Sequence, residues 1–202
     1  MPKIVDHERR RAELADAVLR VIARSGISAV TNKAVAEDAG WSTGVLGHYF
    51  GNQHDLLVAA LRRAAELQGR IFKELSSDDA TPIQRLQAVL ESVLPLDERR
   101  VALTRIFLFF YAEAASNNVA REEVADFLAG WRRVVRRHAI AAQEDGSLPP
   151  VDPTQLATYF VGLADALAMH SIFDPEVMDS LRKNPDIVGN WLISARALGL
   201  NA

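Results

Sequence analysis

The sequence contains no cysteine, which excludes disulfide bonds, thiolate metal sites and a cysteine nucleophile. It also has no long hydrophobic run, because its longest wholly apolar stretch, 106–112, falls far short of the roughly 18 residues of a membrane span. Residues 1–11 are mainly polar and no apolar segment follows them, unlike a secretory signal. We therefore expect a cytoplasmic protein without a membrane partner.

An excess of positive charge is missing as well. The 23 Lys and Arg residues stand against 26 Asp and Glu residues, for a net charge of −3. This balance provides no bulk attraction to nucleic acid, although residues 1–75 carry +2 and residues 76–202 carry −5. With 49% apolar and 24% charged residues, the chain can bury a sizeable core. The composition excludes a polycationic binder and a disordered chain.

Common signatures of enzymes and metal sites are also lacking. The sequence has no GxSxG, no glycine-rich phosphate loop and no HExxH. Its five histidines do not pair at helical spacing, so we expect no metal ion and no cofactor. Asp165 and His170 share one apolar segment, where a polar ligand anchor or an interface hydrogen bond is favoured over a catalytic pair. We predict that the chain is not an enzyme.

Helix boundaries are marked along the whole chain, and no segment alternates as a strand does. Residues that cap helix N-termini precede prolines at four places: Thr81, Asp152, Asp174 and Asn184. Glycines suited to the left-handed residue after a helix stand at 26, 40, 146 and 199. We predict an all-α fold of nine to ten helices near 7–25, 32–39, 42–49, 53–75, 82–94, 98–116, 119–145, 153–173, 175–183 and 186–198.

The segment 31–50 contains two short predicted helices, capped by Thr31 and Ser42 and separated by a turn at Gly40. Two short helices joined by a glycine-containing turn form a helix-turn-helix. An apolar seam would hold them at a fixed angle: Val35, Ala36, Ala39, Leu46 and Phe50. The outward face of the second helix is predicted to enter a DNA major groove with Thr43, Gly44, Val45, His48 and Tyr49.

Residues 7–57 resemble the DNA-binding region of the TetR family of transcriptional regulators. The matching features are a long first helix followed by Thr31, Val35-Ala36, Ala39-Gly40, Ser42, Gly44, Tyr49-Phe50 and Leu56-Leu57. Segment 42–51 is most similar to the repressors of choline–betaine genes, and 163–167 is similar to an Asp-Gly-Leu segment of that subset. The resemblance implies a three-helix DNA-binding domain over 1–52 and a helical-bundle domain for ligand binding and dimerisation over 53–202, with helix 53–75 as connector.

Roles at the DNA follow from the resemblance and from the outward positions. Phosphate contacts are assigned to Thr31, Lys33, Ser42, His48 and Tyr49, and base edges to Thr43, Gly44 and Val45. The family usually has a phosphate-binding Lys where this chain has Gln53, so we expect weaker phosphate affinity and a weaker salt dependence there. The basic run Arg9-Arg10-Arg11 either touches flanking DNA backbone or is a solvated helix end.

Two further sites are predicted in the larger helical region. Inward-facing residues that are candidates for binding a small-molecule effector are Phe107, Phe110, Tyr111, Trp131, His138 and Asp165. Rings beside a carboxylate suit a cationic amine, although an ordinary core would look the same. Apolar residues of the last two long helices are candidates for a homodimer interface, as in the family: Tyr159, Phe160, Leu163, Leu167, Trp191, Leu192 and Leu198.

These features predict a ligand-responsive repressor that binds a palindromic double-stranded DNA operator as a dimer and is released by a small-molecule effector. A second interpretation stays open, in which the chain is an all-α small-molecule binding or enzymatic protein and the helix-turn-helix is structural. That interpretation requires Thr43, His48 and Tyr49 to be buried against the rest of the chain.

Overall fold

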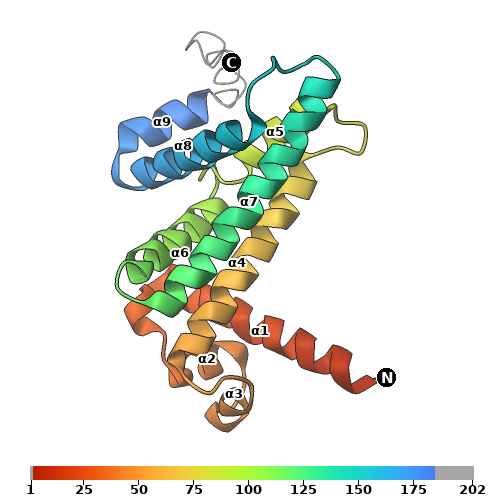
Figure 1. Cartoon of the computed structure of the whole chain (residues 1–202). Helices are drawn as coiled ribbons and strands as arrows, with labels where there is room; N and C mark the ends of the chain where they lie inside the picture. The colour runs from red at the N-terminus through yellow and green to blue at the C-terminus, as the bar shows by residue number, and fades with distance from the viewer. Residues whose placement is uncertain (1, 185–202) are drawn as a thin grey trace. The chain divides into compact units, whose positions relative to one another are not determined.

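The structure is a computed structural model, and it describes residues 2–184, with side chains from residue 7 onward (Figure 1). All regular elements within this range are helical: α1 (Pro2–Ser25), η1 (Ile27–Ala29), α2 (Asn32–Ala39), α3 (Thr43–Tyr49), α4 (Gln53–Leu75), α5 (Pro82–Glu91), α6 (Glu98–Ala114), α7 (Asn118–Glu144), α8 (Pro153–Phe173) and α9 (Pro175–Lys183). The all-α prediction is confirmed. The predicted helix 186–198 lies outside the described residues.

Several helices begin or end at capping residues that the sequence marks. The side chains of Thr81, Asp152 and Asp174 each accept a hydrogen bond from a backbone N–H of the helix that follows. Three of the predicted stop glycines have positive φ angles: Gly26 at 79°, Gly40 at 72° and Gly146 at 78°. The two remaining predictions, a start after Asn184 and a stop at Gly199, fall on residues outside the description.

Helix α5 ends at Glu91, earlier than the predicted end at residue 94. The backbone N–H groups of Val93 and Leu94 bond three residues back, to Leu90 and Glu91, so the chain tightens into a turn. Pro95 accounts for this ending, because a proline disfavours the helical conformation of the residue before it.

The chain divides into two compact units, which we describe separately: unit 1 is Met1–Leu67 with Arg105–Glu123, and unit 2 is Gln68–Thr104 with Val124–Ala202. Helices α4, α6 and α7 each contribute residues to both units. The domain boundary expected between residues 52 and 53 stays a prediction.

The core of unit 1 joins α1 to the two short helices. Leu14, Val18, Val35 and Leu46 are fully buried, and Phe50 is nearly so. Contacts between α1 and α2 and between α2 and α3 hold the two short helices on α1. In the same unit, Ile106, Phe107 and Phe110 of α6 are buried, while the intervening residues are half-buried.

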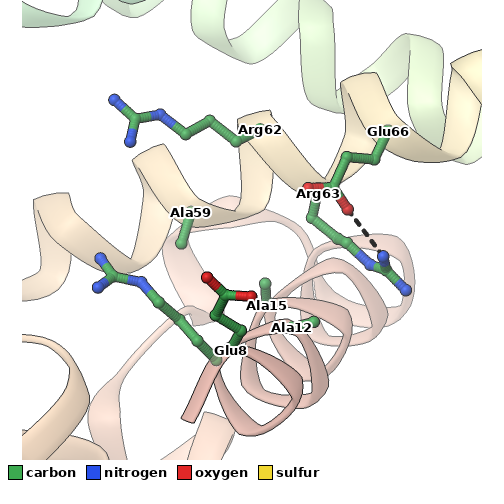
Figure 2. Close-up of a pocket in the computed structure, with 8 residues that line it drawn as sticks. Glu8, Ala12, Ala15, Ala59, Arg62, Arg63 and Glu66 are labelled. Atoms are coloured by element: carbon green, nitrogen blue, oxygen red, sulfur yellow. Dashed lines mark hydrogen bonds and ion pairs between the residues drawn. The ribbon is translucent and has the colours of Figure 1, made fainter. Parts of the chain in front are cut away.

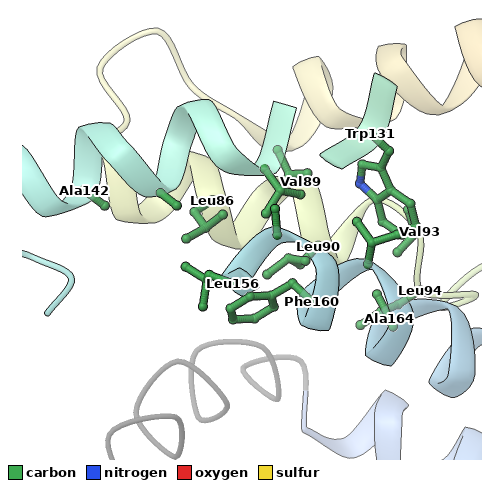
Figure 3. Close-up of a cluster of buried hydrophobic side chains, with 14 of the residues drawn as sticks. Leu86, Val89, Leu90, Val93, Leu94, Trp131, Ala142, Leu156, Phe160 and Ala164 are labelled. Carbon is green, nitrogen blue, oxygen red and sulfur yellow. The ribbon is translucent and has the colours of Figure 1, made fainter. Parts of the chain in front are cut away.

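The core of unit 2 is formed by α5, α7 and α8 (Figure 3). Leu86, Leu90, Trp131, Phe160 and Ala164 pack together there. Among the described residues one helix, α8, has the length and apolar composition of a membrane span. Most of its buried residues belong to this core: Leu156, Ala157, Phe160, Val161 and Ala164.

Candidate nucleic-acid interface

The two short helices begin at exposed hydroxyl caps. Thr31 Oγ1 accepts a hydrogen bond from the Ala34 N–H at 3.1 Å, and Ser42 Oγ accepts one from the Val45 N–H at 3.3 Å. Both capping residues lie at the surface. The turn between the helices passes through Gly40, whose φ of 72° is costly for any residue with a side chain.

Helix α3 presents most of its residues to solvent. Leu46 is the residue of α3 that is buried, and it points into the core of unit 1. Thr43, Gly44 and His48 are exposed, while Val45 and Tyr49 are half-buried. The outward face that the sequence assigns to DNA is therefore accessible within unit 1.

Aromatic rings of 41–50 contact the first turns of α1. The ring centroids of His7 and Tyr49 are 4.5 Å apart, and those of His48 and Tyr49 are 5.5 Å apart. The Arg10 guanidinium carbon lies 5.4 Å from the Trp41 ring centroid, and that of Arg11 lies 5.1 Å from the Phe50 ring centroid. Two arginines of the basic run thus lie over rings of the helix-turn-helix, whereas the sequence predicts either a contact with DNA backbone or a solvated helix end.

An ion-pair cluster fixes α2 against α1. Arg20 Nε donates to Asp38 Oδ2 at 2.7 Å, and Arg24 Nη1 donates to Asp38 Oδ1 at 2.9 Å. Burial alone would raise the pKa of Asp38, but hydrogen bonds from Arg24 and Arg20 outweigh it and hold the pKa below its usual value. The carboxylate therefore stays charged at neutral pH and holds both arginines of α1 against α2.

Two residues assigned to the DNA side differ in their surroundings: Lys33, a predicted phosphate contact, and Gln53, which replaces the usual lysine. Lys33 is highly exposed and lies 3.9 Å from the Glu37 carboxylate, so its amine is accessible to DNA. Gln53 instead uses its side-chain amide within the fold, donating from Nε2 to the Val30 carbonyl. Lys33 is thus a surface cation, whereas the side chain of Gln53 is bonded to the segment before α2.

A groove of about 400 Å³ runs between α1 and α4 in unit 1 (Figure 2). The methyl groups of Ala12, Ala15 and Ala59 line it from both helices. At its edge Arg63 pairs with Asp16 of α1 at 2.7 Å, and Arg62 bonds Glu123 of α7, with 3.1 Å from Nε to Oε2. Adjacent arginines of α4 therefore connect it to α1 and to the start of α7.

The six residues predicted to bind an effector belong to both units. Phe107, Phe110 and Tyr111 lie in unit 1, whereas Trp131, His138 and Asp165 lie in unit 2. Trp131 belongs to the unit 2 core, and Asp165 is half-buried on α8. A single site made of all six stays a prediction.

His138 is buried beside Phe72, with 5.6 Å between the ring centroids. Its Nε2 lies 3.3 Å from Nη2 of Arg137. Burial, followed by the positive charges of Arg137 and Arg85, lowers the pKa of His138 below its ordinary value. Its ring is accordingly neutral at physiological pH. Phe72 is missing from the predicted site.

The predicted dimer residues of α8 point in different directions. Tyr159 is 57% exposed and Leu163 is 44% exposed. Phe160 packs in the core of unit 2, because it follows Tyr159 by about 100° around the helix, and Leu167 is half-buried against that core. Phe173, absent from the prediction, is exposed at the end of α8. Trp191, Leu192 and Leu198 lie outside the described residues.

Comparison with known proteins gives two family matches. Residues 14–60 match the bacterial regulatory proteins of the tetR family, and residues 82–184 match the C-terminal region of the BetI-type transcriptional repressors. The HTH-type transcriptional regulator PksA of Bacillus subtilis is 29% identical over 176 residues, covering 87% of this chain and 84% of that protein.

Two further relatives extend over most of the chain. The HTH-type transcriptional regulator BetI of Rhizobium meliloti is 31% identical over 170 residues, covering 83% of this chain and 80% of that protein. A transcriptional regulator from Saccharomonospora viridis, solved in complex with choline, shares the fold with a TM-score of 0.73 and 23% identity, covering 88% of this chain and 95% of its own. The chain thus belongs to the TetR family of bacterial transcriptional regulators, with a C-terminal region of the BetI type.

Proposed function

We propose that this chain is a ligand-responsive repressor that binds a palindromic operator as a cytoplasmic homodimer, with α3 in the major groove. The observation that carries the proposal is the exposed face of α3, where Thr43, Gly44 and His48 are accessible while Leu46 anchors the helix. Short exposed side chains and backbone at the start of a recognition helix allow close approach to base edges.

The surroundings of this face supply its phosphate contacts. Lys33 adds an exposed cation, and Thr31 and Ser42 add surface hydroxyls at helix starts. Cations and hydroxyls that meet phosphate fix the register on DNA, and the net charge of the whole chain matters less than this local set.

The alternative, an all-α binding protein or enzyme with a structural helix-turn-helix, requires the same face to be covered. Thr43 and His48 are exposed, and Tyr49 is half-buried against His7 and His48. This exposure goes against the alternative, and we do not retain it.

An operator-shift assay with the DNA upstream of the gene tests the proposal. The wild-type protein is expected to shift this DNA, and a His48→Ala/Tyr49→Ala variant is expected to lose at least tenfold in affinity, about 1.4 kcal/mol. Arg136→Ala, which removes an exposed cation of α7 in unit 2, is the matched control and should bind as the wild type does. A wild-type protein that fails to shift the DNA, or a double variant that binds with wild-type affinity, would contradict the proposal.

We further propose that the effector is a cationic amine held in unit 2. Trp131 lies with Phe127 on α7, with ring centroids 6.4 Å apart, and Asp165 supplies a half-buried carboxylate on α8. Aromatic faces and a carboxylate attract a quaternary ammonium group. The choline complex of the Saccharomonospora viridis regulator supports the same ligand chemistry.

Calorimetry with choline and with its neutral isostere 3,3-dimethylbutanol tests this ligand class. Choline is expected to bind, and the isostere is expected to bind at least tenfold more weakly. The Asp165→Asn variant should lose more affinity for choline than for the isostere. Equal binding of the two compounds would argue against a cation site.

Continuity of α4 offers the route from effector to DNA. This helix begins beside the helix-turn-helix and continues into unit 2, so an effector that moves its second half would also move its first. Domain roles of 1–52 for DNA and 53–202 for ligand and dimer follow from this proposal.

A further inference from the structure

We propose that the first turns of α1 brace the recognition helix, and that His7, Arg10 and Arg11 are positioning residues of the DNA interface. The proposal rests on the proposed function, because it requires α3 to enter DNA. It assigns to the basic end of α1 a role other than direct contact with phosphate.

The three residues share one face of α1. Positions i, i+3 and i+4 are neighbours on a helix surface, so His7, Arg10 and Arg11 present their side chains to the same side. Each meets a different ring of the helix-turn-helix. His7 contacts Tyr49, Arg10 lies over Trp41 and Arg11 lies over Phe50.

The three rings bracket α3. Trp41 directly precedes the Ser42 cap, and Tyr49 and Phe50 lie at the other end of the helix. The α1 face therefore contacts the chain immediately before α3 and again where α3 ends. Such paired contacts restrain the tilt and rotation of α3 about its single deep anchor, Leu46.

Helix α3 has few contacts of its own to keep its orientation. It has seven residues, and two of them, Gly44 and Gly47, carry no side chain. A Cβ atom added at Gly47 would have no neighbour within 4 Å, so the structure is open on that side. A short helix with one fully buried side chain depends on what holds its ends, and the α1 face holds both.

Both arginines lie within cation–π range of the rings below them. Both guanidinium and ammonium groups are attracted to an aromatic face, but the planar guanidinium can also stack on it, so lysine is expected to replace arginine only in part in such a contact. A phosphate contact has the opposite property, because lysine neutralises phosphate well. The two roles therefore respond differently to substitution.

Salt dependence provides a second distinction. Each phosphate neutralised by a cation adds about 0.9 to the slope of log K against log salt concentration. A positioning residue changes the affinity at every salt concentration but leaves the slope unchanged. Operator binding by fluorescence anisotropy, measured over a range of KCl concentrations, therefore separates the two roles.

The variants are His7→Ala, His7→Phe, Arg10→Ala, Arg10→Lys, Arg11→Ala and Arg11→Lys. Arg9→Ala is the matched control, since Arg9 forms an exposed ion pair with Glu13. We expect His7→Ala to lower affinity about tenfold and His7→Phe, which keeps a ring, to restore most of it. Each arginine-to-alanine variant should lose about threefold to tenfold in affinity with an unchanged slope, and lysine should restore this loss only in part.

Hydrogen exchange of α3 amides in the free protein gives a readout that DNA contact does not affect. The brace predicts faster exchange over 43–50 in His7→Ala and Arg11→Ala, with wild-type rates in Arg9→Ala. Circular dichroism and melting curves identify variants that fail to fold, and the lysine and phenylalanine variants then decide.

Three results would overturn the proposal. The first is a slope of log K against log salt that falls by about 0.9 for each arginine removed, and the second is full recovery of operator affinity in the lysine variants. The third is operator affinity and amide exchange that stay unchanged in all variants. These outcomes are distinct from failure of the proposed function, in which the wild-type protein itself binds no operator.

Discussion

Gln53 donates a hydrogen bond from its side-chain amide to the backbone carbonyl of Val30, with 2.6 Å between Nε2 and O. The bond links the first residue of α4 to the segment that leads into α2, 23 positions earlier in the chain. The resemblance to the TetR family implies a phosphate-binding lysine at the position of Gln53. This chain uses the position to hold its own helix-turn-helix instead.

Gln53→Lys should therefore exchange internal stability for DNA affinity. The variant loses one neutral hydrogen bond, so we expect the free energy of unfolding to fall by about 1 kcal/mol. It gains a cation at the phosphate position, so the slope of log K against log salt should steepen by about 0.9. Urea unfolding and operator titrations over a range of salt concentrations measure the two effects.

Gln53→Ala is the control for this prediction, because it breaks the bond to Val30 without adding a charge. It should show the same loss of stability and no change in slope. A Gln53→Lys variant with the wild-type slope would contradict the assignment of this position to phosphate.

Asp38→Asn should loosen α2 from α1. The substitution removes the charge that holds Arg20 and Arg24, and the cost is moderated because both arginine side chains are more than half exposed. We expect a loss of about 1–2 kcal/mol in the free energy of unfolding at neutral pH. Glu37→Gln, on an exposed neighbour of Asp38, should cost less than 0.5 kcal/mol or so.

The same carboxylate contributes a pH dependence at acid pH. Because its pKa is lowered in the folded protein, its stabilisation is present above the unfolded pKa of 3.8 and is lost as pH falls below that value. Unfolding measured from pH 6 down to about pH 3 should show a smaller decline in Asp38→Asn than in the wild type. If the stability of the wild type and of Asp38→Asn declines in parallel with falling pH, Asp38 makes no such contribution.

His138 makes a separate contribution nearer neutral pH. Burial and the charges of Arg137 and Arg85 lower its folded pKa below the ordinary 6.5, so the unfolded chain takes up a proton first as pH falls. Its contribution to stability is complete above that ordinary value and declines below it. The His138→Gln variant should not show this decline in stability. The control variant His170→Gln, at an exposed position of α8, should still show it. Melting temperatures across this range measure both.

Leu163→Glu should convert the proposed dimer to a monomer. Leu163 and Tyr159 form an exposed apolar pair on α8, and a charge there would be desolvated when two copies meet. A substitution in the centre of an interface commonly costs 2 kcal/mol or more of binding energy, about 30-fold in the dissociation constant.

Sedimentation velocity and operator titration check the dimer prediction together. The apolar control Leu163→Met should sediment and bind DNA as the wild type does. A Leu163→Glu protein that stays dimeric would place the dimer interface elsewhere.

Local features of the fold were predictable because their causes are local. Thr81 and Asp152 cap helices within three residues of themselves, and Gly40 supplies the left-handed turn between α2 and α3. The apolar pattern continues past Glu91 and predicts an end at residue 94, later than the observed end of α5. The effect of Pro95 on Leu94 decided that ending instead.

Side-chain partners across the fold were harder to predict. The sequence allows two interpretations of the basic run 9–11, a contact with DNA backbone or a solvated helix end. In the structure, Arg10 and Arg11 instead lie over rings some 30–40 residues away. Tyr159 and Phe160 are equally apolar in sequence, yet Tyr159 is exposed and Phe160 lies in the core. Neither outcome follows from hydrophobicity alone.

The sequence by itself determined the helices, their caps, the helix-turn-helix and its outward face, because each depends on residues within about two helical turns of one another. Only the tertiary structure decided that Gln53 bonds Val30, that Asp38 holds two arginines of α1, and that His7 contacts Tyr49. Those contacts join residues from 14 to more than 40 positions apart, and their geometry depends on how the helices pack, which no local pattern encodes.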